Sequence, residues 1–164
     1  MRANLSMIFE RGPKEQMCRC PWVCHGKRLA EGPTVLSQVP VISIIDDDAS
    51  VRVATNRLVR SLGYVTHAFA SADEFLRSPQ LNTTSCVIAD VHMPGMDGVE
   101  MQSRLRAQGS RLPIIFITAF PDDSVRARAL DGGAVCLLAK PFEAATLIKC
   151  LDIALGRAGG GIDN

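Results

Sequence analysis

The chain has 164 residues, a length that fits one domain of ordinary size with a full hydrophobic core. Hydrophobic residues make up 47% of the sequence and charged residues 21%, which is typical of a globular protein and excludes a disordered chain. The net charge of +1 gives no electrostatic footprint for nucleic acid or an anionic membrane, and no apolar run approaches the ~20 residues that span a bilayer.

Two regions of different character meet near residue 40. Residues 1–40 carry the basic excess, lack hydrophobic periodicity and are interrupted by several Gly and Pro residues, so we expect an irregular leader. From residue 41 to residue 156, apolar runs alternate with amphipathic ones, which predicts a folded domain at 41–156. Residues 157–164 include three consecutive glycines and are expected to form a flexible tail.

The leader contains the segment CRCPWVCH at residues 18–25, which raises the question of a zinc site. Structural zinc sites combine two separated ligand pairs, and this tight cluster lacks a partner element, which argues against metal binding. An alternative hypothesis is that residues 1–34 derive from an upstream start site and that Val35 is the native initiator. The leader also lacks the apolar stretch of about 7–15 residues that a secretory signal requires.

Cys86, Cys136 and Cys150 lie inside apolar segments. We expect them to be small buried hydrophobic side chains with free thiols. Free thiols suit a reducing compartment, so the sequence predicts a cytoplasmic location.

Five apolar runs from residue 41 onward are predicted strands. They are residues 41–45, 64–70, 85–90, 113–118 and 134–140. The runs are continuously apolar rather than alternating, which is typical of a parallel sheet covered on both faces.

An amphipathic segment follows each of these strands. The predicted helices lie at residues 51–62, 71–78, 98–109, 122–133 and 147–155. Ser71 and Glu74 have the spacing of a capping box, and Gly63 and Gly109 end the helices that precede them. Because crossovers between parallel strands are right-handed, five alternating strands and helices predict an α/β fold, a doubly wound five-stranded parallel sheet with five helices.

Charged and polar residues stand at the carboxyl ends of these strands. Asp46 and Asp47 follow the first strand, Asp90 ends the third, Thr118 the fourth and Lys140 the fifth. In open α/β sheets, ligands bind beyond the carboxyl ends of the strands, so we expect these side chains to converge on one site.

Three carboxylates so close together are costly unless a divalent cation lies between them, and Mg²⁺ is the common cytosolic candidate. A metal held in this way can bind a phosphoryl oxygen and neutralise charge during transfer. Lys140 and Thr118 suit the remaining phosphoryl oxygens, and Asp90 can attack phosphorus to form an acyl phosphate. Pro141 makes a cis bond after Lys140 possible.

The motifs IIDDD, VIADVHMPGMDG, FITA and LLAKPF resemble, in order and spacing, the receiver domains of two-component response regulators. The resemblance covers roughly residues 41–156 and is strongest for receivers of nitrogen-fixation-type regulators. It implies a flavodoxin-like receiver fold with strand order 2-1-3-4-5.

The resemblance also implies roles for the site residues. Asp90 would accept a phosphoryl group from a histidine kinase, and Mg²⁺ would be bound by Asp47, Asp90 and the backbone carbonyl of His92, with Asp46 acting mainly through water. The chain would then catalyse only its own Mg-dependent phosphorylation and dephosphorylation and would not be an enzyme with a separate substrate. Asp48 stands at a position that varies among family members, so we expect it to start a helix.

One position departs from the family pattern. The resemblance implies that Thr118 moves toward the phosphate and that Lys140 pairs with it. Family members often carry Tyr or Phe three residues before the lysine as a rotamer switch coupled to the threonine, and here that residue is Leu137. Leucine has no ring that could move inward, which argues against the usual coupling. His92 stands two residues after Asp90, where family members vary and tune the lifetime of the phosphate.

Only nine residues follow Leu155, so we expect a stand-alone receiver without a DNA-binding domain. Its expected partners are a histidine kinase and a downstream protein target or phosphotransfer protein, with no direct contact to nucleic acid or membrane. The expected partners also include a second copy of the chain, bound through the face at residues 122–156.

The sequence leaves two alternatives open. The first is a phosphohydrolase of the haloacid-dehalogenase type, whose D-x-D-x-[TV] frame is matched at Asp46 and Asp48 but not at Ser50. That reading leaves the segment ADVHMPGMDG unexplained. The second is a degenerate receiver that acts only as a binding module, which Leu137 favours and the intact acids, Thr118 and Lys140 oppose.

Overall fold

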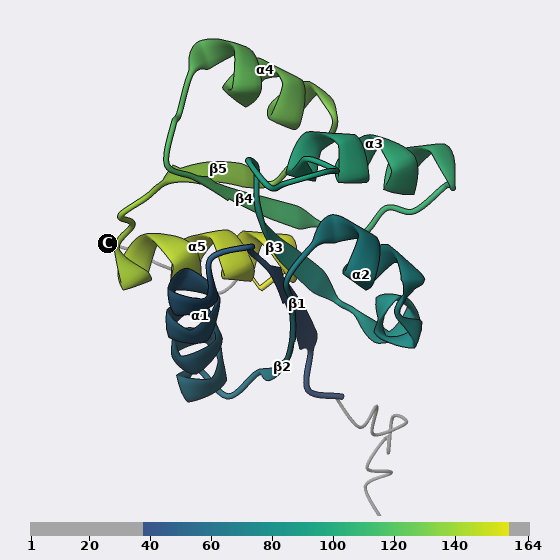
Figure 1. The fold of residues 1–164 in the computed structure, drawn as a ribbon. Helices are drawn as coiled ribbons and strands as arrows, with labels where there is room; N and C mark the ends of the chain where they lie inside the picture. The colour runs from purple at the N-terminus through teal and green to yellow at the C-terminus, as the bar shows by residue number, and fades with distance from the viewer. Residues whose placement is uncertain (1–37, 158–164) are drawn as a thin grey trace, which may run out of the picture. The chain divides into compact units, whose positions relative to one another are not determined.

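The structure is a computed structural model that describes residues 38–157. Within this range a five-stranded sheet consists of β1 (Val41–Ile45), β2 (Val65–Phe69), β3 (Cys86–Asp90), β4 (Ile114–Thr118) and β5 (Cys136–Ala139). All pairings are parallel, and the strands lie in the order β2-β1-β3-β4-β5 (Figure 1). The predicted doubly wound sheet and its order are confirmed. The predictions for residues 1–37, including the cysteine-rich segment and the alternative start, and for residues 158–164 lie outside the described residues.

Five α-helices connect or follow these strands. They are α1 (Ala49–Ser61), α2 (Ala72–Arg77), α3 (Gly98–Ala107), α4 (Asp123–Asp131) and α5 (Ala144–Ala154). A short 3-10 helix, η1 (Pro79–Thr83), lies between α2 and β3 and was not predicted. From residue 38 to residue 157, no helix combines the length and apolar character needed to cross a membrane.

The helices cover both faces of the sheet, as Figure 1 shows, with α1 and α5 on one face and α2, α3 and α4 on the other. Successive strand residues point to opposite faces, so each strand contributes to both cores. In β3, Val87 and Ala89 pack in the cluster on the α2–α4 side, whereas Cys86 and Ile88 pack in the cluster on the α1/α5 side. This double burial explains why the strands are continuously apolar in sequence.

Side-chain caps start α1 and α2 at the residues that the sequence indicates, whereas α5 has no side-chain cap and begins at Ala144, three residues before its predicted start. The Asp48 carboxylate accepts hydrogen bonds from the backbone N–H groups of Ser50 (2.7 Å) and Val51 (3.3 Å), and these bonds lower the pKa of Asp48. The expected helix-start role of Asp48 is confirmed. Ser71 Oγ likewise accepts from the N–H of Glu74 at 3.2 Å.

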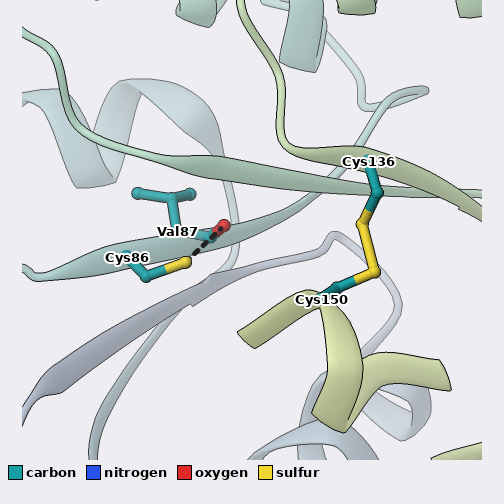
Figure 2. The surroundings of a disulfide bond; sticks show 4 residues. All are labelled: Cys86, Val87, Cys136 and Cys150. Carbon is teal, nitrogen blue, oxygen red and sulfur yellow. Dashed lines mark hydrogen bonds between the residues drawn. A yellow bond between two sulfur atoms is a disulfide. The ribbon is translucent and has the colours of Figure 1, made fainter. Parts of the chain in front are cut away.

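The prediction that Cys136 and Cys150 are free thiols is wrong. A disulfide joins them and so links β5 to α5, with their Cα atoms 6.6 Å apart (Figure 2). Both side chains face the α1/α5 side of the sheet, where α5 packs against β5. The two cysteines are 14 positions apart in sequence, and their proximity arises from the packing of the strand against the helix, which apolar patterning alone does not reveal.

Cys86 is a free, fully buried thiol, as predicted. Its sulfur donates to the backbone carbonyl of Val87 at 3.6 Å (Figure 2). Burial raises the pKa of the Cys86 thiol to about 12 by disfavouring the thiolate. Because the thiolate is the reactive form, Cys86 is a packing residue rather than a reactive one.

We expect reduction of the Cys136–Cys150 disulfide to lower the free energy of unfolding by about 3 kcal/mol, because the bond closes a short loop and restricts the unfolded chain. Urea unfolding with and without dithiothreitol measures the difference. The double variant Cys136→Ala/Cys150→Ala is the control and should not respond to the reductant. Equal sensitivity of the two proteins to dithiothreitol would contradict the prediction.

Candidate functional site

The carboxyl ends of β1, β3 and β5 meet at one group of charged side chains. Carboxylate oxygens of Asp46, Asp47 and Asp90 lie within 4.8 Å of one another. Lys140 Nζ lies 2.9 Å from Asp46 Oδ2 and 2.5 Å from Asp90 Oδ2. The structure therefore brings together four of the residues that the sequence places at strand ends. Thr118 ends β4 next to them, where its carbonyl accepts the backbone N–H of Lys140 at 2.7 Å.

Backbone and side-chain contacts fix the turn that carries the first two acids. The N–H of Asp48 donates to Asp46 Oδ1 at 2.9 Å, which orients the carboxylate of Asp46. The guanidinium of Arg52, in the first turns of α1, donates to the carbonyls of Asp46 (2.6 Å) and Asp47 (3.3 Å). This arrangement leaves Asp46 buried and Asp47 exposed to solvent.

Burial and neighbouring charges change the pKa values of Asp46 and Lys140. Burial raises the pKa of Asp46 even though the hydrogen bond and charge of Lys140 act in the opposite direction. Burial alone would lower the pKa of Lys140, but hydrogen bonds to Asp90 and Asp46, together with their charges, raise it above its ordinary value. Lys140 is therefore held as an ammonium ion between two carboxylates.

The donor set fits a hard divalent cation. Three carboxylates provide oxygen ligands close to one another, and oxygen is the ligand that Mg²⁺ prefers. One lysine neutralises only part of this negative charge. For His92, the structure shows its backbone N–H donating to Asp90 Oδ1 at 3.1 Å, while the proposed role of its carbonyl as a ligand stays a prediction.

The hydroxyl of Thr118 is buried and has two partners. It accepts the backbone N–H of Phe120 at 3.1 Å, and it lies 3.2 Å from Nδ1 of His92. Leu137, at the position where the family often has an aromatic residue, is buried in the cluster on the α2–α4 side.

The residues that sequence reasoning missed are those whose importance depends on close packing. Gly98 begins α3 directly against the end of β3, and a Cβ atom at this position would clash with the carbonyl oxygen of Asp90 and lie 2.9 Å from the ring of Phe116. Its place after the turn sequence MPGMD was the available signal. The sequence does not distinguish Arg52 from an ordinary arginine on the surface of a helix.

Residues 42–152 match the family described as the response regulator receiver domain. Nodulation protein W of Bradyrhizobium diazoefficiens is 38% identical over 126 residues, which cover 77% of this chain and 56% of that protein. Transcriptional regulatory protein FixJ of the same organism is 38% identical over 117 residues, which cover 71% and 57%. The chain thus spans little more than half the length of these relatives.

A solved structure of a chemotaxis protein has the same fold. The chemotaxis protein CheY4 of Vibrio cholerae superposes with a TM-score of 0.66 and 28% sequence identity. The superposition covers 71% of this chain and 99% of that one. A receiver-type chain therefore accounts for nearly the whole described region, whereas the longer relatives extend beyond it.

We expect Gly98→Ala to lower the free energy of unfolding by about 1–3 kcal/mol, because the added methyl group overpacks the contact between α3 and the backbone of Asp90. Urea denaturation measures the change. Ser103→Ala, on the exposed side of the same helix, is the control and should stay within about 0.5 kcal/mol. An unchanged Gly98→Ala protein would mean that the helix start has more room than the structure shows.

Proposed function

The chain belongs to the response-regulator receiver family, and we propose that Asp90 accepts a phosphoryl group from a histidine kinase in a Mg²⁺-dependent reaction. The proposed receiver spans residues 41–156, which include the whole region matched to the family. We further propose that phosphorylation changes a protein-binding face of the domain. The chain would act as a signalling switch that catalyses only its own phosphorylation and dephosphorylation.

The observation that supports this proposal is the position of Lys140 between two buried carboxylates. Its ammonium contacts both Asp46 and Asp90, and Asp47 completes a compact acidic group. A structural ion pair needs one carboxylate per lysine, whereas this group has three. The surplus of oxygen ligands and the central cation suit the binding of a metal and a phosphoryl group together.

The reaction requires one bond to break and one to form. In the forward step a carboxylate oxygen of Asp90 attacks the phosphorus of a phosphohistidine, the N–P bond breaks, and its electrons return to the imidazole of the kinase. The product is an aspartyl phosphate. The signal ends by dephosphorylation. Water attacks the same phosphorus, and the O–P bond to Asp90 breaks to give the carboxylate and inorganic phosphate.

The residues of the site have distinct tasks in this step. Asp46, Asp47, Asp90 and the carbonyl of His92 would hold Mg²⁺, which when bound neutralises charge on the phosphoryl oxygens. The ammonium of Lys140, already 2.5 Å from Asp90, would exchange part of its contact with the carboxylate for a phosphoryl oxygen.

The kinase is proposed to dock beside Lys140. A cavity of about 540 Å³ lies between α1 and the loop that follows β5. It is lined by Val51, Ala54, Thr55, Leu58, Lys140, Pro141, Phe142 and Ala144. This largely apolar surface adjoins the lysine of the phosphorylation site, so a protein that binds here can present a phosphohistidine to Asp90.

The output face is proposed at residues 122–156, which include α4, β5 and α5. Leu130 and Ile153 are large apolar side chains on these helices that are 43% and 58% exposed. Such side chains suit a downstream protein, a phosphotransfer protein or a second copy of the chain. Because phosphohistidine donors draw on cytosolic ATP, we propose a cytoplasmic location for this exchange, although the Cys136–Cys150 disulfide removes the support that free thiols were expected to give.

Acetyl phosphate and Mg²⁺ should place one phosphoryl group on Asp90, which peptide mass spectrometry locates. Asp90→Asn should abolish the label because the amide cannot act as the nucleophile. Asp73→Asn, which changes a half-exposed carboxylate of α2 that pairs with Arg77, is the control and should be labelled like the unmodified chain. A label that persists in Asp90→Asn, or that passes through Asp46, would contradict the proposal.

Mg²⁺ should stabilise the folded chain, because a ligand that binds only the folded state raises the free energy of unfolding. At a concentration tenfold above the dissociation constant the gain is about 1.4 kcal/mol. Urea unfolding in Mg²⁺ and in EDTA measures it. Asp47→Asn should remove the gain, whereas Asp73→Asn should keep it. Equal stabilisation of the two variants would exclude the acidic group as the metal site.

A further inference from the structure

The imidazole of His92 lies between the hydroxyl of Thr118 and the ring of Phe120. Its Nδ1 is 3.2 Å from Thr118 Oγ1, and its ring centroid is 6.1 Å from that of Phe120 at an interplanar angle of 88°. His92 belongs to the loop after β3, whereas Phe120 belongs to the loop after β4. The three side chains therefore connect a buried hydroxyl to an aromatic ring that is 72% exposed.

The Thr118 hydroxyl has two hydrogen-bond partners, the backbone N–H of Phe120 and the imidazole of His92. The oxygen already accepts the backbone N–H of Phe120 at 3.1 Å. The Thr118 hydroxyl and Nδ1 of His92 form one further hydrogen bond, whose direction depends on the tautomer of His92. With the hydroxyl as the donor, the ring proton of His92 lies on Nε2.

Strand β5 supplies no aromatic ring to Thr118. The residue three positions before Lys140 is Leu137, which packs in the cluster on the α2–α4 side. A leucine side chain can neither accept a hydrogen bond from the hydroxyl nor move a ring into the space that the hydroxyl vacates. The ring that contacts Thr118 is instead that of His92, from the loop after β3, the strand that flanks β4 on the side away from β5.

We propose that His92 is a positioning residue that holds the Thr118 hydroxyl in the unphosphorylated chain, in place of an aromatic residue on β5. The inference rests on the proposed function. A phosphoryl group on Asp90 offers oxygens to the Thr118 proton, which cannot be donated to His92 and to a phosphoryl oxygen at the same time. Transfer of the hydrogen bond releases the imidazole and its contact with Phe120, so phosphorylation changes the loop that leads into α4.

The first test needs neither metal nor phosphate. Nitrogen NMR of the imidazole in the unmodified chain at pH 8 should show His92 with an unprotonated, hydrogen-bonded Nδ1 and a proton on Nε2. Thr118→Val should shift the Nδ1 signal because the bond is lost. A proton on Nδ1, or an Nδ1 signal that Thr118→Val leaves unchanged, would overturn the inference.

The second test measures the affinity for beryllofluoride, a phosphoryl mimic, in the presence of Mg²⁺ by amide NMR titration. His92→Phe keeps a ring beside Phe120 but lacks the acceptor, so Thr118 is freed and the affinity should rise about three- to tenfold. His92→Asn places an amide oxygen near the position of Nδ1 and should restore the affinity to within about twofold of the unmodified chain. His92 is exposed, so both variants should fold.

The outcomes separate the inference from the proposed function. Equal affinities of His92→Phe and His92→Asn, or a weaker affinity of His92→Phe, would overturn the role of His92 while leaving phosphorylation of Asp90 intact. An unmodified chain that does not bind beryllofluoride would contradict the proposed function and the phosphoryl-driven release. The Nδ1 measurement in the resting chain would still decide whether His92 holds Thr118.

Discussion

The ammonium of Lys140 balances two buried carboxylates, and the rest of the site depends on this balance. Removal of charges from water costs several kcal/mol per ion, so Asp46 and Asp90 can lie close together only with a cation between them. The compensation is incomplete, because burial still raises the pKa of Asp46 despite its contact with Lys140. With the carboxylate of Asp47 added, the group retains an excess of negative charge that a further cation would reduce.

The parallel sheet makes this arrangement possible. Asp46 and Lys140 are 94 positions apart in sequence, and Lys140 and Asp90 are 50 apart. Because all strands run in the same direction, their carboxyl ends lie at one edge, and the register pairs Asp90 with Ile117, the residue before Thr118. The buried apolar strands on both faces therefore act as a rigid support that holds mutually repelling groups in place.

Sequence reasoning located the residues whose position follows from strand order alone. They are Asp46, Asp47, Asp90, Thr118 and Lys140, each of which stands where an apolar strand ends. It failed where the outcome depends on distances between elements. The bond between Cys136 and Cys150 requires that a strand residue and a helix residue face the same side, and the clash at Gly98 requires the close approach of α3 to β3. The contact of His92 with Thr118 likewise depends on how two loops meet.

These contacts also limit where a change at the site can spread. The disulfide ties β5 to α5, so the two elements cannot separate independently on that face of the sheet. The far end of α4 is held by α3, since Gln102 donates to the carbonyl of Ala129 at 3.2 Å and Arg106 donates to that of Gly132 at 3.1 Å. The near end of α4 follows the loop whose Phe120 N–H and ring contact Thr118 and His92. The loop before α4 is therefore tied directly to the site, and the rearrangement of the Thr118 hydroxyl proposed above would act first on this loop.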